Sequence, residues 1–281
     1  MTEPFKLPGF DLDAFVAATL AEDLGSGGDR TSAAVIPAEA QLHAVMASRD
    51  EVVVAGLPLA LAFIRALDPQ AHFEVVAHDG DHLPAGSALL RISANARALL
   101  TAERSALNTV QHLTGIATLT RQYVDAIHGT GAILLDTRKT LPGLRVLEKY
   151  ATRMGGATNH RMRLDDGVMI KDNHIAVAGG VEAAVRAAKA AGLHDIVVEV
   201  DSLDQIPPAL GAGADRLLLD NMGPPMLREA VALIAGRVPT EASGGVNLNT
   251  IRAIAETGVT YISVGRITQS APAADIGLDF A

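Results

Sequence analysis

The sequence predicts an α/β protein with two parts: a mixed α+β region, then a parallel sheet that is either open or closed into a barrel. Two observations support this prediction. After Gly131, short apolar runs alternate with helical patterns six times, and six consecutive strand–helix units imply a parallel sheet with right-handed crossovers. Before Gly131, strands and helices are mixed without strict alternation, which is typical of an α+β domain.

The first part begins with an amphipathic pattern that predicts a helix over residues 11–24, ending in the glycine-rich loop 25–28. The strands expected after it cover residues 42–48, 52–54, 73–77 and 88–93, and a helix covers residues 57–67. A mostly helical stretch, residues 95–128, completes this part, with a break expected near Thr114 and Gly115.

The second part alternates strands and helices. Its expected strands cover residues 132–136, 167–171, 196–200, 216–220, 238–241 and 261–264. Its expected helices cover residues 144–154, 181–191, 203–210, 225–235 and 248–257. Residues with useful chemistry end or follow every strand, and they are Arg138, Lys139, Lys171, Glu199, Asp220, Asn221, Ser243, Gly244, Gly245, Gly265 and Arg266. Because barrel enzymes build their sites at the carboxyl ends of the strands, we expect a catalytic rim there.

Positive charge is concentrated between Asp136 and Lys171. This window holds eight basic and four acidic residues, a net charge of +4, whereas the whole chain carries −9. Such a run is also typical of a solvated helix face. Here, however, cations such as Arg138 and Lys139 stand at the ends of apolar runs, so we expect them to face an anionic ligand. Arginine forks suit a carboxylate or a phosphate.

Glycines follow the last two predicted strands. Ser243, Gly244 and Gly245 follow one strand, and Gly265 follows the next. Glycine lets backbone N–H groups approach an oxygen closely, and a helix N-terminus just after the loop adds its dipole. The two loops therefore predict a phosphate site, which barrels commonly place after their last two strands.

Two carboxylates and one histidine at this rim each allow two interpretations of their role. Glu199 and Asp220 either form structural ion pairs with the basic residues or hold Mg²⁺ together with substrate phosphates. His160, beside Arg161, is either a structural or a ligand-binding histidine. Arg104 belongs to a Glu-Arg pair on a predicted helix, a pattern that by itself indicates a surface feature.

The composition excludes several classes of protein. With 49% hydrophobic and 20% charged residues in 281, the chain is globular and long enough for one barrel or two domains. It has no cysteine, which excludes disulfides, thiolate zinc sites and cysteine nucleophiles and fits a cytoplasmic location. We expect no signal peptide and no membrane association, because the apolar runs are short. The acidic, aromatic-poor chain offers no surface for nucleic acid.

Five motifs, occurring in this order, resemble those of the quinolinate phosphoribosyltransferase family, also called carboxylating nicotinate-nucleotide pyrophosphorylases. They are GDRTS at 28–32, ERSALN at 103–108, TRKTLPGLR at 137–145, NHR at 159–161 and IKDNH at 170–174. Short matches that begin at Glu199, Asp220 and Ser243 continue the resemblance, which covers nearly the whole chain.

The resemblance implies an incomplete (β/α) barrel over residues 111–270. It is preceded by an α+β open sandwich domain over residues 1–110, on which the tail 271–281 packs back. The implied activity transfers phosphoribosyl from phosphoribosyl diphosphate to quinolinate with decarboxylation, giving nicotinate mononucleotide, diphosphate and CO₂ in de novo NAD biosynthesis. Also implied are Mg²⁺, bound with phosphoribosyl diphosphate, and a homodimer in which Arg104 reaches the partner's active site.

The motif matches assign roles to individual residues. The implied quinolinate-binding set is Arg138, His160, Arg161 and Lys171, with Arg104 from the partner. The positions implied at the diphosphate, ribose and Mg²⁺ are Lys139, Glu199 and Asp220, and those at the 5-phosphate are Ser243, Gly244, Gly245 and Gly265. The expected catalytic residues are Lys139, Lys171, Glu199 and Asp220, the last two also being the expected metal ligands.

One loop departs from the family pattern. Many members carry a histidine where this chain has Gln269 and a small residue where it has Arg266. Gln269 still donates a hydrogen bond but carries no charge, so Arg266 is the candidate to supply the missing cation for phosphate binding.

Other functions remain open at this point. One is a related phosphoribosyltransferase that acts on another aromatic acid. A second is a lyase or isomerase barrel for a phosphorylated sugar, in which Lys171 would form a Schiff base. A third, a non-catalytic anion-binding protein, is disfavoured by the carboxylates Glu199 and Asp220.

Overall fold

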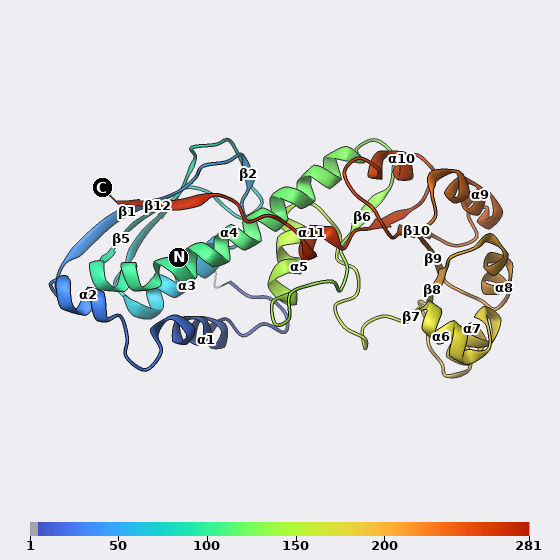
Figure 1. Ribbon diagram of the computed structural model, residues 1–281, viewed down its shortest axis with the longest axis horizontal. Coiled ribbons are helices and arrows are strands. Elements are labelled where there is room, and N and C mark those ends of the chain that lie inside the picture. The colour runs from blue at the N-terminus through green and yellow to red at the C-terminus, as the bar shows by residue number, and fades with distance from the viewer. Residues whose placement is uncertain (1–4, 281) are drawn as a thin grey trace. The chain divides into compact units, whose positions relative to one another are not determined.

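The computed structural model describes residues 5–280, which divide into two compact units (Figure 1). Unit 1 comprises the described residues of Met1–Leu119, Val146–Gly155 and Ala271–Ala281. Unit 2 comprises Thr120–Arg145 and Gly156–Ser270. None of the described helices is both long enough and apolar enough to cross a membrane.

Unit 1 is built on a four-stranded antiparallel sheet with the order β12-β1-β5-β3. The bounds of its strands are β1 Gln41–Ser48, β3 His72–Val75, β5 Ala88–Asn95 and β12 Ile276–Phe280. A short separate ladder pairs β2, Val52–Val53, with β4, His82–Leu83. The last strand of the chain therefore pairs with the first, so residues from both ends of the sequence share one sheet.

Five helices accompany this sheet in the chain: α1 Leu12–Leu24, α2 Arg30–Val35, α3 Leu57–Leu67, α4 Ala96–Ala126 and α5 Arg145–Met154. Side-chain caps explain where the first two begin. Asp11 accepts a hydrogen bond from the backbone N–H of Ala14 at 3.0 Å, and Asp29 accepts one from that of Ser32 at 2.9 Å. Each cap satisfies one of the unpaired N–H groups that open a helix.

Helix α4 differs from the sequence-based prediction, because it runs without the break expected at Thr114 and Gly115. The glycine has a packing role instead. A Cβ atom at Gly115 would lie 2.0 Å from the carbonyl oxygen of Pro272, so only glycine lets this C-terminal segment approach the helix. The expectation of a break was wrong because it treated a long-range contact as a local signal.

Unit 2 contains six parallel strands in the order β6-β11-β10-β9-β8-β7. Their bounds are β6 Ile133–Leu135, β7 Met169–Ile170, β8 Val197–Val200, β9 Arg216–Asp220, β10 Thr240–Ser243 and β11 Tyr261–Ser263. In the part of the chain that the structure describes, β6 and β7 end the sheet and do not pair with each other. The predicted α/β class with an incomplete parallel barrel is therefore confirmed.

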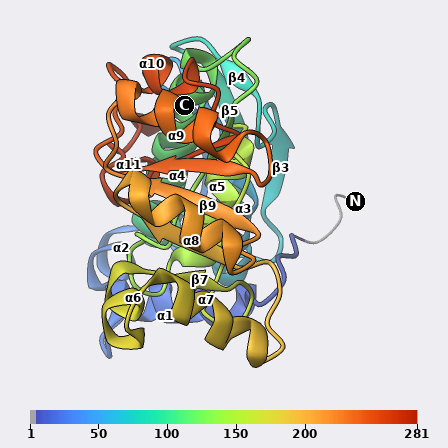
Figure 2. The ribbon, with the colours of Figure 1, turned by 90° about the vertical axis from the view of Figure 1, so that its right-hand side faces the viewer.

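Helices α7 Val181–Ala190, α8 Ile206–Gly211, α9 Pro224–Ile234 and α10 Ile251–Ala255 follow one another along the outside of this sheet (Figures 1 and 2). The 3₁₀ turn η1, Leu203–Gln205, leads into α8, and α11 spans Arg266–Gln269. Helix α6, Asp172–Ala178, was not predicted; none of its residues is buried, so it has no apolar stripe that a periodicity could reveal.

Strand alternation decides which side chains face the interior of unit 2. In β9, Leu217 and Leu219 are fully buried, whereas Leu218 and Asp220 line a cavity on the other face. Register places Glu199 and Glu241 opposite Leu218, and Ser243 opposite Asp220. The period of two therefore gathers polar side chains from three neighbouring strands on one side.

Candidate active site

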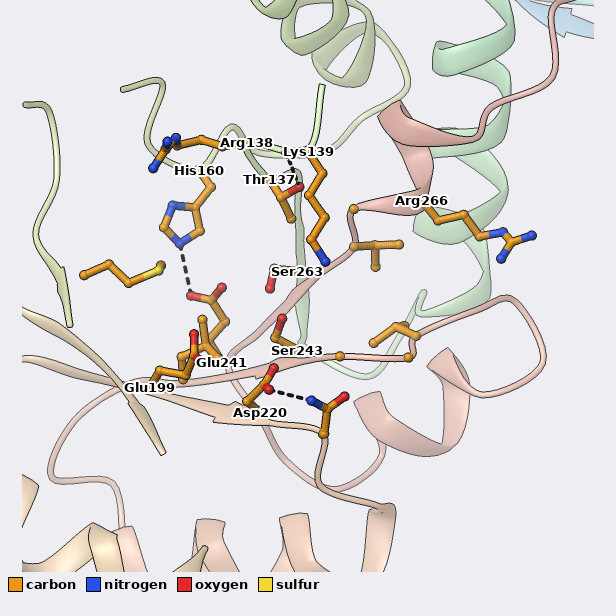
Figure 3. Close-up of a pocket in the computed structure, with 18 of the residues that line it drawn as sticks. Thr137, Arg138, Lys139, His160, Glu199, Asp220, Glu241, Ser243, Ser263 and Arg266 are labelled. Carbon is orange, nitrogen blue, oxygen red and sulfur yellow. Dashed lines mark hydrogen bonds and ion pairs between the residues drawn. The ribbon is translucent and has the colours of Figure 1, made fainter. Parts of the chain in front are cut away.

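A cavity of about 630 Å³ opens at the carboxyl ends of the parallel strands in unit 2 (Figure 3). Twelve of the site residues predicted from the sequence line it: Arg138, Lys139, His160, Arg161, Lys171, Glu199, Asp220, Ser243, Gly244, Gly245, Gly265 and Arg266. The fold thus brings these residues together, as predicted, from segments spread over more than a hundred residues of sequence.

Arg104 is the predicted site residue that does not line this cavity. It lies on α4 in unit 1, is exposed, and makes one long hydrogen bond from Nη1 to Asn108 Oδ1 at 3.5 Å. Its proposed role in a partner's active site stays a prediction.

Two arginines form a cationic wall of the cavity. Burial first, and the charge of Arg138 second, lower the pKa of Arg161. Arg161 Nη1 donates to the carbonyl oxygen of Gly167 at 2.9 Å, whereas the buried Nε of Arg138 has no hydrogen-bond partner among the described residues. Like charges held together with an unmatched donor are expensive to bury, and an anionic ligand would relieve that cost.

Lys171 and Glu199 face each other across the neighbouring strand ends. Lys171 Nζ lies 2.5 Å from Glu199 Oε2, and the Glu199 side chain is 11% exposed while that of Lys171 is 46% exposed. The ion-pair reading of Glu199 is therefore observed. The pair also leaves the lysine end open to the cavity, where its charge can reach a ligand.

Asp220 is the second acidic residue at this rim. Burial first, and the charge of Glu199 second, raise its pKa above the ordinary value of 3.8, although Lys171 and Lys139 oppose the shift. Two carboxylates that repel each other in a partly buried place suit a divalent cation. Within the described residues there is no cluster of three or more His, Cys, Asp and Glu able to hold a metal ion. The carboxylates alone would thus supply two ligands at most, as in sites that Mg²⁺ shares with water and phosphates.

Two glycine loops also line the cavity. Gly244 and Gly245 have φ angles of +89° and +64°, which side chains rarely adopt, and a Cβ at Gly265 would lie 2.7 Å from Lys139 Cδ. The sequence also predicted a helix N-terminus directly behind each loop. This was wrong for the first loop, because residues 246–250 separate it from α10. It holds for the second loop, where α11 begins directly after Gly265, although this helix has only four residues. Backbone N–H groups are what these loops offer a phosphate.

Arg266 and Gln269 line the edge of the cavity and are both exposed. Figure 3 shows the Arg266 side chain extending away from Glu199 and Asp220, whereas Lys139 reaches into the cavity. Of the two cations, Lys139 is thus the better placed in this structure, and a phosphate role for Arg266 stays a prediction.

Glu241 is a cavity residue that the sequence reasoning missed. It lies in β10, is fully buried, and its Oε2 lies 3.4 Å from His160 Nε2 and 3.3 Å from Arg216 Nη1. Burial would raise the pKa of Glu241, but His160, Ser263 and Arg216 outweigh it and lower the pKa. An available signal was that Glu241 stands two residues before Ser243, so both share one face of the strand.

His160 is held by hydrogen bonds at one ring nitrogen and at its backbone, and its other ring nitrogen faces Glu241. Its Nδ1 accepts a hydrogen bond from the backbone N–H of Arg161 at 2.7 Å, so Nε2 carries the ring hydrogen and faces Glu241. The backbone N–H of His160 donates to Asp136 Oδ1 at 2.8 Å. The ring is therefore fixed against the carboxylate beneath the arginine wall, as Figure 3 shows.

Replacing Glu241 with alanine should destabilise the chain. The change leaves Arg216 and His160 without the carboxylate they share. Removing one partner of a buried ion pair lowers the free energy of unfolding by about 3 kcal/mol. Urea unfolding at pH 7 measures the effect. The control is Glu256→Ala, which breaks the half-exposed ion pair with Arg252 and should change stability by no more than about 0.5 kcal/mol. Equal effects of the two changes on stability would contradict a structural role for the buried Glu241 carboxylate.

Comparisons with known proteins match both parts of this chain. Residues 29–114 match the N-terminal domain of quinolinate phosphoribosyl transferase, and residues 116–279 match its C-terminal domain. The nicotinate-nucleotide pyrophosphorylase [carboxylating] of Mycobacterium leprae is 44% identical over 270 residues, covering 94% of this chain and 95% of that one. The chloroplastic protein of the same name from Arabidopsis thaliana is 41% identical over 296 residues, covering 98% and 84%.

Solved structures show the same relationship. The nicotinate-nucleotide pyrophosphorylase of Francisella tularensis superposes with a TM-score of 0.93 at 38% sequence identity, and the match covers 100% of both chains. That of Ehrlichia chaffeensis gives a TM-score of 0.92 at 38% identity, covering 97% of this chain and 100% of that one. Both domains, nearly the full length and the fold agree, so this chain belongs to the quinolinate phosphoribosyl transferase family.

Proposed function

We propose that this chain transfers the phosphoribosyl group of phosphoribosyl diphosphate to the ring nitrogen of quinolinate, with loss of one carboxylate as CO₂. The products are nicotinate mononucleotide, diphosphate and CO₂, which makes the reaction a step of de novo NAD biosynthesis. The observation that carries the proposal is a single cavity lined by two arginines, two glycine loops and two carboxylates.

The arginine side suits a dicarboxylate. Quinolinate carries two negative charges, and Arg138, Arg161 and Lys171 supply more cations than one carboxylate needs. Arginine forks bind carboxylates with two parallel hydrogen bonds, and the unmatched Nε of Arg138 is a donor without another use in the described chain. These features support quinolinate over an aromatic acid with a single carboxylate.

The glycine side and the carboxylates suit phosphoribosyl diphosphate. Backbone N–H groups of the Ser243–Gly245 loop and of Gly265 would bind the 5-phosphate, and Lys139 the diphosphate. We propose that Glu199 and Asp220 hold Mg²⁺ together with the diphosphate oxygens, where the ion would neutralise charge on the leaving group. Burial first, and repulsion from Glu199 second, raise the pKa of Asp220, and a divalent cation would offset both.

Positioning and electrostatics would do the catalytic work. Arg138, Arg161 and Lys171 would hold the pyridine nitrogen against C1 of the ribose, so that the nitrogen–carbon bond forms as the bond from C1 to diphosphate breaks. The positive charge of the new pyridinium nitrogen then stabilises the electron pair left on the adjacent ring carbon when its carboxylate departs as CO₂, and that pair takes up a proton from solvent. No side-chain nucleophile is required.

The alternative of a Schiff-base lyase has less support. A lysine that forms a Schiff base must present a neutral amine, whereas Lys171 is in an ion pair with Glu199 at 2.5 Å. No other observation at the cavity favours that chemistry, so we retain the phosphoribosyl transfer.

We further propose that the chain acts in the cytoplasm as a homodimer, with Arg104 contributed to the partner's active site. The exposed position of Arg104 on α4, with one long hydrogen bond to Asn108, leaves its guanidinium available for such a contact. The absence of cysteine fits a reducing compartment.

Mixing two inactive variants tests the shared site. Arg104→Ala and Lys171→Ala should each be inactive, but a mixed dimer has one site with both residues intact. An equimolar mixture after subunit exchange should regain roughly a quarter of wild-type activity, because half of the dimers are mixed and half of their sites are complete. Mixed dimers, verified by two different affinity tags, that stay inactive would contradict the shared site.

The reaction itself is tested by mixing the protein with quinolinate, phosphoribosyl diphosphate and Mg²⁺ and following CO₂ and nicotinate mononucleotide together. We expect the two products in equal amounts. A second assay replaces quinolinate with nicotinate. If nucleotide forms from nicotinate without CO₂, and not from quinolinate, the proposed binding of phosphoribosyl diphosphate stands and the proposed binding of a dicarboxylate is overturned. No product from either acid would overturn the proposal as a whole.

A further inference from the structure

Asn221 has an unusual backbone conformation at the carboxyl end of β9. Its φ angle is +55°, and within the described chain only Asp195 and Ala235 share a positive φ without being glycine. Asparagine tolerates this left-handed region better than most residues, but the conformation still costs free energy relative to glycine. Such strain persists where surrounding contacts demand it, and it often marks functional positions.

The contacts of Asn221 join two loops of the cavity. Its side-chain Nδ2 donates to Asp220 Oδ2 at 2.5 Å, the bond drawn at Asp220 in Figure 3. Its backbone N–H donates to the carbonyl oxygen of Ser243 at 2.9 Å. A Cβ atom at Gly244 would lie 2.1 Å from Asn221 Oδ1, so the amide lies directly against the backbone of the glycine loop.

The amide also selects one oxygen of the carboxylate. Because Asn221 takes Oδ2 of Asp220, and Oδ1 forms no hydrogen bond within the described chain, Oδ1 is the oxygen left for a ligand. A left-handed residue is what turns the amide back onto the preceding carboxylate while its N–H reaches the next strand. The strain at Asn221 therefore has a structural purpose.

We propose that Asn221 is a positioning residue that fixes the Asp220 carboxylate against the Ser243–Gly245 loop, so that the metal-side and phosphate-side groups keep one spacing for phosphoribosyl diphosphate. This inference rests on the proposed function of those groups and adds to it a residue that ties them together. A residue that orients a ligating carboxylate typically changes affinity or activity about 10- to 100-fold when it is lost.

Asn221→Gly separates function from stability. Glycine adopts the same φ without strain, so the variant should melt at the same or a higher temperature, while it loses the bond to Asp220 and the contact with Gly244. We expect the Kd for phosphoribosyl diphosphate with saturating Mg²⁺, measured by calorimetry, to rise about tenfold or more, and KM for quinolinate to change by less than about twofold. The matched control is Ala235→Gly at the end of α9, which relieves the same strain away from the cavity and should leave both constants unchanged.

Asn221→Asp is a second variant of nearly the same shape. It replaces the amide donor with a carboxylate beside Asp220, whose other charged neighbours are Glu199, Lys171 and Lys139. The carboxylate cannot donate a hydrogen bond to Asp220 Oδ2, so the Kd for phosphoribosyl diphosphate with saturating Mg²⁺ should again rise about tenfold or more, while KM for quinolinate should change by less than about twofold. A merely structural role for Asn221 would change both constants together.

The outcomes distinguish the two proposals. If the wild-type chain fails to bind phosphoribosyl diphosphate with Mg²⁺, the proposed function fails. If it binds, and Asn221→Gly binds equally well with a melting temperature that is the same or higher, the positioning role is overturned and the proposed function stands. An unchanged Kd for phosphoribosyl diphosphate in Asn221→Asp would overturn it independently, including in the case that the glycine variant does not fold.

Discussion

Arg138→Ala should abolish turnover of quinolinate while the protein remains folded. The residue lies in the loop that follows β6, and its buried Nε donates to no acceptor in the described chain, so its side chain contributes little to the stability of the fold. Its removal also takes a positive charge away from Arg161, whose pKa is lowered first by burial and then by Arg138. We therefore expect the melting temperature without substrate to stay the same or to rise.

The catalytic loss should be large because the guanidinium would act on a charged group in a partly buried site. Removing one such preorganised donor costs about 3 kcal/mol, or 10²-fold or more in rate. The measurement is kcat/KM for quinolinate at saturating phosphoribosyl diphosphate, with Arg138→Lys as a comparison that keeps the charge but loses the fork. Arg186→Ala, which breaks an exposed ion pair with Glu182 on α7, is the control and should leave kcat/KM unchanged. Near-normal turnover in Arg138→Ala would contradict the assignment of Arg138 to quinolinate binding.

Local patterns in the sequence were sufficient for the architecture of unit 2. Strand–helix alternation predicted parallel strands, and parallel strands bring their carboxyl ends to one rim, so the cavity residues could be named before any geometry was known. The charge pattern between Asp136 and Lys171 pointed to the same rim. The strand–helix alternation and the charge pattern are both local in sequence, so neither requires knowledge of contacts between distant segments.

Contacts between distant segments were beyond those patterns. Gly115 suggested a helix break, but its meaning lies in the close approach of Pro272, which no local rule contains. Glu241 is an acid in a buried strand, and only its partners Arg216 and His160 explain how it is tolerated there. The link from Asn221 to Ser243 depends on the pairing of β9 with β10. In each case tertiary structure supplied the partner that the sequence left unnamed.

Asp220→Asn should make the fold more stable and the enzyme less active. Burial and the charge of Glu199 raise the pKa of Asp220, so the folded chain holds this proton more tightly than the unfolded chain does. The ionised carboxylate therefore lowers the stability of the fold. This cost is absent below the ordinary aspartate pKa of 3.8 and is complete once the pH has risen above the folded-state value.

Asparagine keeps the shape and cannot ionise, so the variant should unfold at a higher urea concentration than wild type at pH 7 in the absence of Mg²⁺ and substrate. The difference should shrink as the pH falls toward 3.8. Activity should fall about 10²-fold or more, because a neutral amide is a poor partner for Mg²⁺ and leaves the diphosphate charge without compensation.

Asp215→Asn is a matched control with the opposite sign. Burial alone would raise the pKa of Asp215, but Lys189 and the backbone N–H of Ile196 lower it, so its charge favours the fold. That variant should lose stability at pH 7, the loss should fade as the pH falls through the lowered pKa, and kcat should not change, because the residue is not part of the cavity lining. If both asparagine variants shifted stability in the same direction at pH 7, the prediction that the ionised carboxylate of Asp220 destabilises the fold would be contradicted. The raised pKa would then be excluded as a reason to place a divalent cation there.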